Sequence, residues 1–472
     1  MKSKLMKWSA LIGRAVLCGV GGLQILYALR WAWENGSNIQ DFYDSGIYLG
    51  NALTMCSDGW HLVGYSCLLK IFMLFEGVLG NSYIILLYIF QVVTSLLCFA
   101  AGYQSISRHL FDCTISYSKA ILPAIYILTL PVIWQMQFAV LPDALCLSLI
   151  VLVMAKLLEN IAETKKINIY SYLAILGSGL LMGVLKYHYF YGFIFLLIFY
   201  VCIMIFKVLT SKKKMRLYIN KIIALVIILV MLPITVNGIN KSVPETGNYT
   251  SYCISAELLS RFVYPNIGED YQYYSEEIKE ALPQEKVMNP IIYYETYYEE
   301  FGVLIQNVEK ENGCKLFFEM AKTGFEQHTE SFIKGTIKEV ILYTFAPLSI
   351  VKNMYNNGNS LYGHNYTKMY EMSPGLTADY MHIGMNGLLL TCLIGILIVL
   401  LEIIFGRQYL KRNIVIIIFM FLNIWSVTFF MMLFSIMKFD YRIGLFSVFI
   451  WAVTSLIYIN DIGKELNGLR SK

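Results

Sequence analysis

Charged residues are scarce in this chain of 472 residues: Asp, Glu, Lys and Arg together make up 15% of it, whereas hydrophobic residues make up 57%. Soluble domains carry about a quarter of their residues as charged side chains, so the composition excludes an ordinary water-soluble protein. A strong excess of basic residues is also lacking. The net charge is only +5, and the Lys and Arg residues form short clusters between apolar stretches, which excludes a nucleic-acid partner and instead marks the ends of membrane spans.

Cysteine is rare outside the apolar stretches. Most of the ten Cys residues lie in segments such as "SLLCFAAG", where a free thiol behaves as a small hydrophobic side chain. Only Cys253 and Cys314 lie in the long polar part of the chain. If that part faces an oxidising compartment, these two residues are the pair that the sequence offers for a disulfide.

The N-terminus lacks the small-residue cleavage site of a secretory signal peptide. Its basic start, "MKSKLMK", is followed by an apolar run that reaches Trp31, about the length of a full membrane span. An uncleaved signal-anchor helix is therefore expected.

Ten apolar stretches are long enough to cross a hydrocarbon core of about 30 Å. They cover residues 8–31, 82–104, 117–135, 138–158, 169–186, 188–207, 217–238, 381–405, 413–435 and 441–460. Two further stretches, 61–80 and 332–350, are apolar but ambiguous. The sequence therefore predicts an all-α polytopic membrane protein that is surrounded by membrane lipid.

The positions of Lys and Arg predict an orientation for these spans. If Lys2, Lys4 and Lys7 are cytoplasmic, the later basic clusters between spans also fall on the cytoplasmic side, provided that neither ambiguous stretch crosses the membrane alone. We therefore predict a multi-pass protein of the cell membrane with a cytoplasmic N-terminus. Three parts follow: a transmembrane module at 1–238 with an outer acidic loop at 32–60, an extracytoplasmic region at 239–380, and C-terminal transmembrane helices at 381–472.

The extracytoplasmic region is the one long polar block of the chain. Within it the segment "CKLFFEMAKTGFEQHTESF" has apolar residues, including Leu316, Phe317 and Met320, near the i, i+3, i+4 spacing of a helix. We expect a small, mainly helical ectodomain.

Two carboxylates lie in the outer loop after the first span, in the sequence "QDFYDSGIYLGNAL". Ser37 and Gln40 have the spacing of a capping box, which predicts that a helix begins just before this segment. On such a helix Asp41, Asp44 and Tyr48 would share one face. This face is either the polar side of a surface helix or part of a site, and a second acidic segment elsewhere would favour the site.

Asp143, in "LPDALCLSL", is that second acidic residue, because it lies at the outer start of an apolar helix behind Pro142. A carboxylate at a helix N-terminus is stabilised by the free N–H groups, and this explains many such residues without a function. Ionisable residues within membrane spans, however, are costly and mark functional sites. We predict a functional role for Asp143.

Two basic turns are predicted on the same outer face. Lys186 and His188 lie between two spans in "GVLKYHYFYG", and Arg442 precedes the last span in "MKFDYRIGLF". Snorkelling of Lys186 to the interface and an ion pair between Arg442 and Asp440 are the alternatives without a function. Arg is well suited to bidentate binding of a phosphate.

Acidic and basic groups together on the outer face suit a reaction on a lipid-linked phosphate. Basic side chains would hold the phosphate of the leaving group. A carboxylate would act as general base on an incoming hydroxyl or, as Asp44 and Asp143 together, hold a divalent cation such as Mg²⁺ or Mn²⁺.

The order of these features resembles the type-C integral-membrane glycosyltransferases, in particular the protein mannosyltransferase and aminoarabinose transferase relatives. That family has an acidic motif D-E-x-x-Y-x-x-x-A after its first span. The segment "DSGIYLGNA" is similar, with Asp44, Tyr48 and Ala52 at the matching positions, and departs from it at Ser45, where the family has a second acid. "LPDALCLSL", "GVLKYHY" and "DYRIGLFSVFIWA" are similar to later segments of the family.

The resemblance implies a bundle of about 10–12 transmembrane helices with juxtamembrane helices on the outer face. It also implies transfer of a sugar, with inversion, from a polyprenyl-phosphate donor to a protein, lipid or glycan acceptor. Asp44 would be the general base, with Asp143 as the second catalytic carboxylate. The substrate-binding residues would be Asp41, Tyr48, Lys186, His188 and Arg442, with the donor phosphate near Lys186 and Arg442.

Three other functions are open at this point. A transporter or flippase of lipid-linked saccharides should have polar residues at mid-membrane depth on several helices, whereas most spans here are apolar through their centres. A polysaccharide polymerase or ligase would be expected to use an outer loop rich in Arg and His, and 239–380 holds only Arg261, His328 and His364. A scaffold without enzymatic activity is the third.

Overall fold

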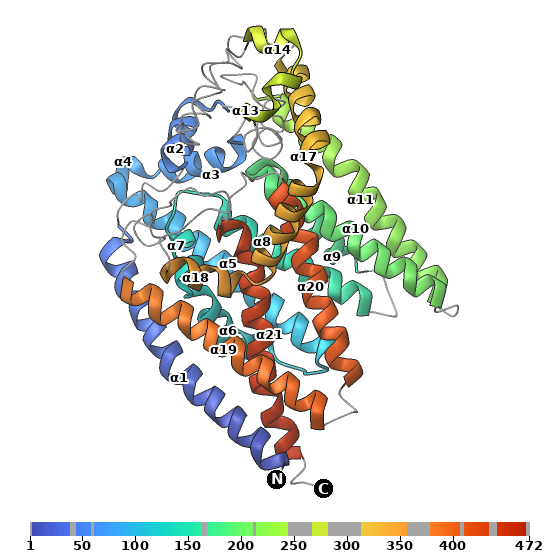
Figure 1. Cartoon of the computed structure of the whole chain (residues 1–472). Helices are drawn as coiled ribbons and strands as arrows, with labels where there is room; N and C mark the ends of the chain where they lie inside the picture. Colours follow the sequence, from blue (N-terminus) through green and yellow to red (C-terminus); the bar gives the residue numbers. More distant parts are fainter. Residues whose placement is uncertain are drawn as a thin grey trace.

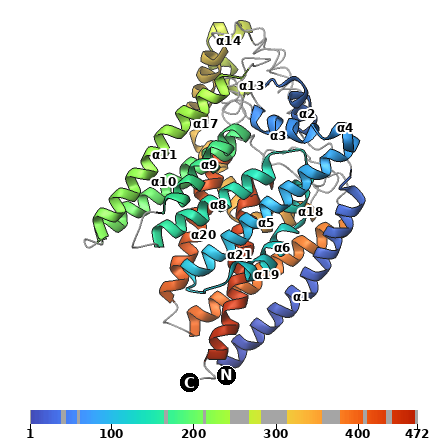
Figure 2. The ribbon, with the colours of Figure 1, turned by 180° about the vertical axis from the view of Figure 1, so that it is seen from behind.

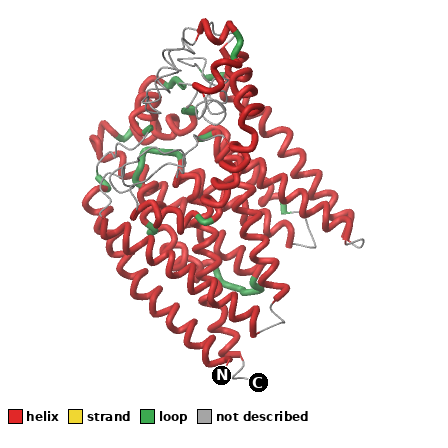
Figure 3. Tube along the Cα trace, in the orientation of Figure 1, coloured by secondary structure: helices red, strands yellow, loops and turns green. Residues whose placement is uncertain are grey.

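The computed structural model describes residues 2–37, 44–57, 61–162, 168–210, 214–243, 267–281, 313–355, 378–405, 410–433 and 441–468. Within these ranges the regular structure consists of helices, without a strand (Figure 3). The prediction of an all-α protein is confirmed. Residues 38–43, which include Asp41, lie outside the described part, as do Cys253 and the side chain of Cys314 of the predicted disulfide.

The helices follow one another along the chain from α1 to α21. Those of the first half are α1 (Lys2–Asn35), α2 (Ser45–Thr54), α3 (Val63–Met73), α4 (Glu76–Leu79), η1 (Gly80–Ser82), α5 (Tyr83–Leu110), α6 (Tyr117–Leu128), α7 (Pro131–Gln137), α8 (Asp143–Ala162), α9 (Ile169–Leu185), α10 (Tyr187–Thr210) and α11 (Met215–Lys241). Those of the second half are α13 (Ile267–Asp270), η4 (Tyr271–Tyr273), α14 (Glu276–Ala281), α17 (Gly313–Thr344), α18 (Ala346–Tyr355), α19 (Ala378–Phe405), α20 (Leu410–Leu433) and α21 (Tyr441–Gly468).

Eight apolar segments in the described residues are long enough to cross a membrane: α1, α4 with α5, α8, α10, α11, α19, α20 and α21. The pair α6 and α7, bent by 95°, makes a ninth only if the two helices are counted together as one broken span. The chain is therefore a multi-pass α-helical membrane protein. The expected number of 10–12 is higher than this count, partly because α9 has only 17 residues and ranks as a shorter apolar helix.

The bend between α6 and α7 has a local cause. Pro131 is the first residue of α7, and the residue before a proline is disfavoured in the helical region. Leu130 accordingly has an extended conformation, with φ −61° and ψ 131°. The predicted span 117–135 is therefore two helices, and α7 is completely buried among its neighbours.

Neither ambiguous stretch forms a span of its own in the described residues. Residues 61–80 are divided between α3 and α4, and the 11 residues of α3 reach only about 17 Å. Residues 332–350 contain the end of α17 and the start of α18. This agrees with the condition that the positive-inside argument required.

The first residues of α1 and the last of α21 lie at one end of the bundle, and α2, α3, α13 and α14 lie at the opposite end (Figures 1 and 2). We call the end with α2 and α3 the site end. Of the described helices of the predicted extracytoplasmic region 239–380, α13, α14 and the first half of α17 also lie there. The second half of α17 descends along the bundle, and α18 packs on α19 and α21.

The two innermost spans, α8 and α21, begin at the site end. The apolar window of α21 is 89% buried and that of α8 is 72% buried, more than in any other candidate span described. Gly102 of α5 lets both approach closely, since a Cβ there would lie 2.6 Å from Val151 and 2.9 Å from Phe449. This packing fixes the first residues of α8 and α21, which carry Asp143 and Arg442, relative to each other.

Candidate functional site

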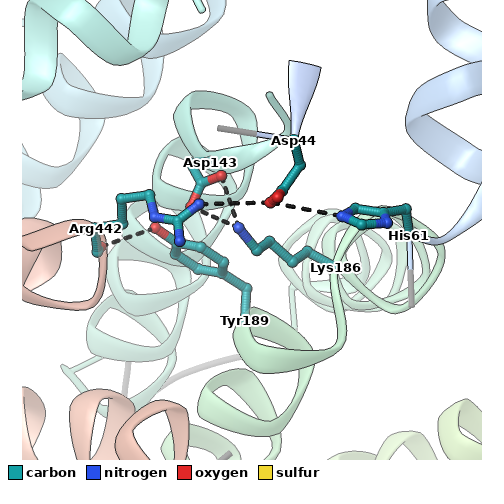
Figure 4. A network of polar contacts seen from close by, with 6 residues as sticks. All are labelled: Asp44, His61, Asp143, Lys186, Tyr189 and Arg442. Carbon is teal, nitrogen blue, oxygen red and sulfur yellow. Dashed lines mark hydrogen bonds and ion pairs between the residues drawn. The ribbon is translucent and has the colours of Figure 1, made fainter. Parts of the chain in front are cut away.

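Four of the predicted site residues, Asp44, Asp143, Lys186 and Arg442, lie in one polar network at the site end (Figure 4). They come from four places in the chain: the start of α2, the first residue of α8, the junction of α9 and α10, and the second residue of α21. The structure thus brings together side chains that are up to nearly 400 residues apart in the sequence.

Asp143 and Lys186 form the buried half of the network. The Nζ of Lys186 donates to both carboxylate oxygens of Asp143, at 3.0 and 2.8 Å. Lys186 has an extended backbone (φ −162°, ψ 119°) just after α9 ends, which turns its side chain out of the helix path. The Asp143 side chain is 1% exposed and that of Lys186 is 15% exposed, so each charge depends on the other.

Asp44 and Arg442 form the more exposed half. One oxygen of Asp44, Oδ2, lies 3.7 Å from Nη1 of Arg442, and the Asp44 side chain is 35% exposed. The prediction that Asp44 lies inside a helix with Tyr48 is wrong. Asp44 is the N-cap residue of α2, and its backbone carbonyl accepts from the Tyr48 amide, while its side chain makes no capping hydrogen bond. The carboxylate is therefore free of its own helix and faces the cations.

Two further members, His61 and Tyr189, were missed in the sequence. His61 Nε2 lies 3.5 Å from Oδ2 of Asp44, and the Tyr189 hydroxyl donates to the backbone carbonyl of Arg442 at 3.3 Å. His61 directly follows the acidic outer loop, but no pattern in the residues around it indicates this contact. His188 lies in the first turn of α10 beside Lys186 and is half-buried, but it is not one of the six residues of Figure 4.

Tyr48, predicted to bind substrate, is buried and supports His61. Its ring packs edge-on against His61 at 5.0 Å and against Tyr65 at 5.2 Å between centroids. Only 2% of Tyr48 is exposed. In the described structure Tyr48 is therefore a buried residue that packs behind the network and supports the His61 ring.

A close approach between α3 and α9 sets the place of His61. A Cβ at Gly64 would lie 2.5 Å from the backbone oxygen of Val184, so only glycine permits this distance. Gly64 is three residues after His61, and Val184 is two residues before Lys186. The contact therefore holds the His61 and Lys186 segments side by side.

The charges around Asp44 favour its ionised form. Burial raises the pKa of Asp44, but the hydrogen bond and charge of His61, and then the charges of Arg442 and Lys186, lower it more. The pKa of this carboxyl is therefore held well below its usual range. Burial, followed by the charges of Asp143 and Asp44, raises the pKa of Tyr48, so both carboxylates act on the same phenol.

The residues do not fit a metal site as they stand. Both oxygens of Asp143 are bound by Lys186, and Asp44 faces Arg442 and His61. Among the described residues no group of three or more His, Cys, Asp and Glu side chains is gathered for a metal. The predicted metal-ligand pair of Asp44 and Asp143 stays a prediction.

A ladder of buried polar side chains lies beneath the network and holds the turn that leads to Asp143. Gln91 of α5 donates to the backbone oxygens of Gln137 and Ala139, at 2.7 and 3.3 Å, and accepts from the Tyr65 hydroxyl at 3.1 Å. The Gln137 side chain in turn accepts from Ser95 at 2.8 Å. Because Tyr65 packs on Tyr48, Gln91 links the α2–α3 side of the site to the α8 side.

Replacing Gln91 with Met should lower the free energy of unfolding by about 2 kcal/mol, because buried groups that Gln91 now pairs would lose their partner. Gln104→Met is the matched control. It lies on the same helix and removes one bond, to the Ile115 carbonyl at 2.9 Å, so it should cost only about 1 kcal/mol. Unfolding in detergent micelles measures both. Equal losses in the two variants would contradict the role given to Gln91.

No protein-family model matches the chain, and neither the curated proteins nor the solved structures gave a match.

Proposed function

We propose that this chain is a membrane glycosyltransferase that moves a sugar from a polyprenyl-phosphate donor to an acceptor of the cell envelope. The observation that carries the proposal is a partly exposed, ionised carboxylate, Asp44, beside the cations of Arg442 and Lys186. A base for an incoming hydroxyl and a binding place for a phosphate leaving group then lie next to each other, as the reaction requires.

The phosphate of the donor would bind Arg442 and Lys186. Arg442 offers a planar fork of donors that matches phosphate oxygens, and it already lies beside Asp44. Lys186 adds a second positive charge, which Asp143 holds in place through two hydrogen bonds. In this scheme Asp143 is a positioning residue for Lys186.

Asp44 would act as the general base. The oxygen of the acceptor hydroxyl attacks the anomeric carbon, its proton passes to the Asp44 carboxylate, and the bond from the anomeric carbon to the phosphate oxygen breaks. The electron pair of that bond leaves with the polyprenyl phosphate, and attack from the opposite side inverts the configuration. His61 orients the carboxylate from the side away from Arg442.

Donor binding would also make Asp44 a stronger base. In the free protein the charges of Arg442 and Lys186 lower the pKa of Asp44. A bound phosphate shares those charges, so their effect on Asp44 weakens and its pKa rises toward the ordinary value. Proton abstraction would thus be favoured only when the donor is in place.

The orientation proposed from the basic residues puts this site on the outer face of the cell membrane, with the N-terminus in the cytoplasm. The acceptor is then a protein, lipid or glycan of the envelope. The buried polar ladder lies within spans, as a transport path would, but Gln91, Gln137 and Ser95 bond with one another or with backbone groups, which favours a structural role.

The test is a transfer assay with the purified protein in nanodiscs and a panel of polyprenyl-phosphate sugars. Extracted envelope material serves as acceptor, and mass spectrometry follows the release of polyprenyl phosphate. We expect release with at least one donor. If the donor instead crosses between the leaflets of liposomes with its sugar still attached, the protein is a flippase and the proposal is wrong.

A further inference from the structure

The second half of α17 carries an apolar stripe that no part of the described protein covers. Ile333, Ile337 and Ile341 are 49%, 55% and 53% exposed, and Phe345 directly after the helix continues the stripe. The spacing of four residues places them along one side of the helix. The opposite side is packed on the bundle, where Tyr343 is buried.

The end of α17 is hydrogen-bonded to two membrane spans, α20 and α21. The backbone oxygen of Thr344 accepts from Ser447 and Trp451 of α21, at 3.0 and 2.7 Å. Its hydroxyl accepts from Trp425 of α20 at 2.8 Å. Trp451 is about 13 Å along α21 from Arg442, at 1.5 Å per residue, so Thr344 lies well below the end of the spans.

The stripe also continues a lipid-facing surface. Phe345 lies 6.2 Å from the Phe421 ring of α20, and Phe421 stacks on Trp425. Trp425 and Ile418 are exposed on α20, which is itself a candidate span, and an exposed apolar face on a membrane span contacts lipid.

The exposed charges on α17 stop where the membrane would begin, and Glu339, the charged residue that follows them, is buried in the protein. Glu330, Lys334 and Lys338 are exposed above the anchor, whereas the exposed residues that follow are apolar, namely Ile341 and Phe345. Lys338 lies about 9 Å above Thr344 along the helix, at a height where a Lys side chain reaches phospholipid head groups. Although α17 as a whole is not a candidate span, its last turns are suited to lipid.

We propose that the elbow formed by residues 337–348 is embedded in the leaflet at the site end, and that Ile341, Phe345 and Leu348 bind phospholipid acyl chains. Leu348 of α18 is also exposed, at 54%, and follows Phe345 by three residues. The elbow is then a membrane-embedded element that does not cross the bilayer. It is held beside α21, the helix that presents Arg442 to the site.

Photo-crosslinking tests this proposal independently of any enzymatic activity. The photoreactive residue p-benzoylphenylalanine is placed at position Ile341 or, in a second variant, at Leu348. A third variant carries it at Phe325, which is exposed and apolar but lies before the kink of α17 at His328. The full chain is reconstituted into nanodiscs of phosphatidylethanolamine and phosphatidylglycerol and irradiated.

Mass spectrometry should show phospholipid adducts at both elbow positions, at least tenfold more abundant than at Phe325. Equal adduct yields at all three positions, or no adduct at the elbow, would place the stripe outside the bilayer and overturn the proposal. A cross-linked dimer in place of lipid adducts would show that a second copy of the chain covers it, and would overturn it as well.

Discussion

Replacing Lys186 with Met is expected to lower the free energy of unfolding by about 3–5 kcal/mol, the usual cost of removing one partner from a buried ion pair. The loss arises because Asp143, 1% exposed, keeps a carboxylate that no longer has its cation. A methionine side chain offers no donor in place of the two hydrogen bonds that Lys186 makes to it. Unfolding in mixed micelles measures the effect.

Two controls distinguish the effect of this buried ion pair from that of a partly exposed ion pair. Lys156→Met breaks the pair with Glu159, whose side chains are 28% and 35% exposed, and should cost less than about 1 kcal/mol. The double variant Lys186→Met with Asp143→Leu removes both charges and should recover most of the loss. If Lys186→Met costs no more than Lys156→Met, the two residues do not form the buried half of the network.

The spans and the acidic and basic segments of the site could be predicted from the sequence because they depend on local chemistry. A long apolar run must be helical in lipid, since every backbone group needs a partner within its own segment. Asp143, Lys186 and Arg442 each interrupt such runs near an end. An ionisable side chain is energetically costly there, so its presence indicates a partner or a function. Positive-inside counting then placed them on one face.

The features that could not be predicted from the sequence depend on contacts between segments that are far apart in the chain. His61 belongs to the network because α3 packs on α9 at Gly64, which no pattern within "DGWHLVGY" indicates. The start of α2 after Asp44 leaves the carboxylate facing groups from three other segments, whereas the capping box at Ser37 and Gln40 predicted a helix start within residues outside the described part. The anchoring of α17 by Thr344 combines residues from α17, α20 and α21, and hydropathy along one helix cannot reveal it.

The network also shows how the fold stabilises opposite charges near lipid. The buried ion pair lies between two spans, and the exposed carboxylate lies on a juxtamembrane segment. Asp143 is fixed by α8 and by the turn that Gln91 holds, whereas Asp44 is an N-cap residue whose side chain makes no capping hydrogen bond. The rigid pair would set the place of the phosphate, and Asp44, the more accessible group, would meet the incoming acceptor.

Replacing Asp44 with Asn should reduce glycosyl transfer by about 10²–10⁴-fold, the usual contribution of a general base. The amide has nearly the same shape as the carboxylate, so packing is retained while the base is lost. Asp379→Asn is the control, because Asp379 is an exposed carboxylate in the first turn of α19 and has no part in the network of Figure 4. It should keep the wild-type rate.

The pH dependence gives the same proposal a second test. Because the folded state lowers the pKa of Asp44, its ionised form contributes stability above its unfolded pKa of about 3.9. That contribution is lost as the pH falls through the lower folded pKa. The wild type and Asp44→Asn should therefore differ in stability at neutral pH and converge in strong acid.

The pH profile of the transfer rate is a separate measurement. Since kcat/KM reports the ionisations of the free protein, titration of Asp44 should not lower kcat/KM at any pH above about 4. A transfer rate for Asp44→Asn near that of the wild type would remove Asp44 from the role of base, even if the stabilities behave as expected.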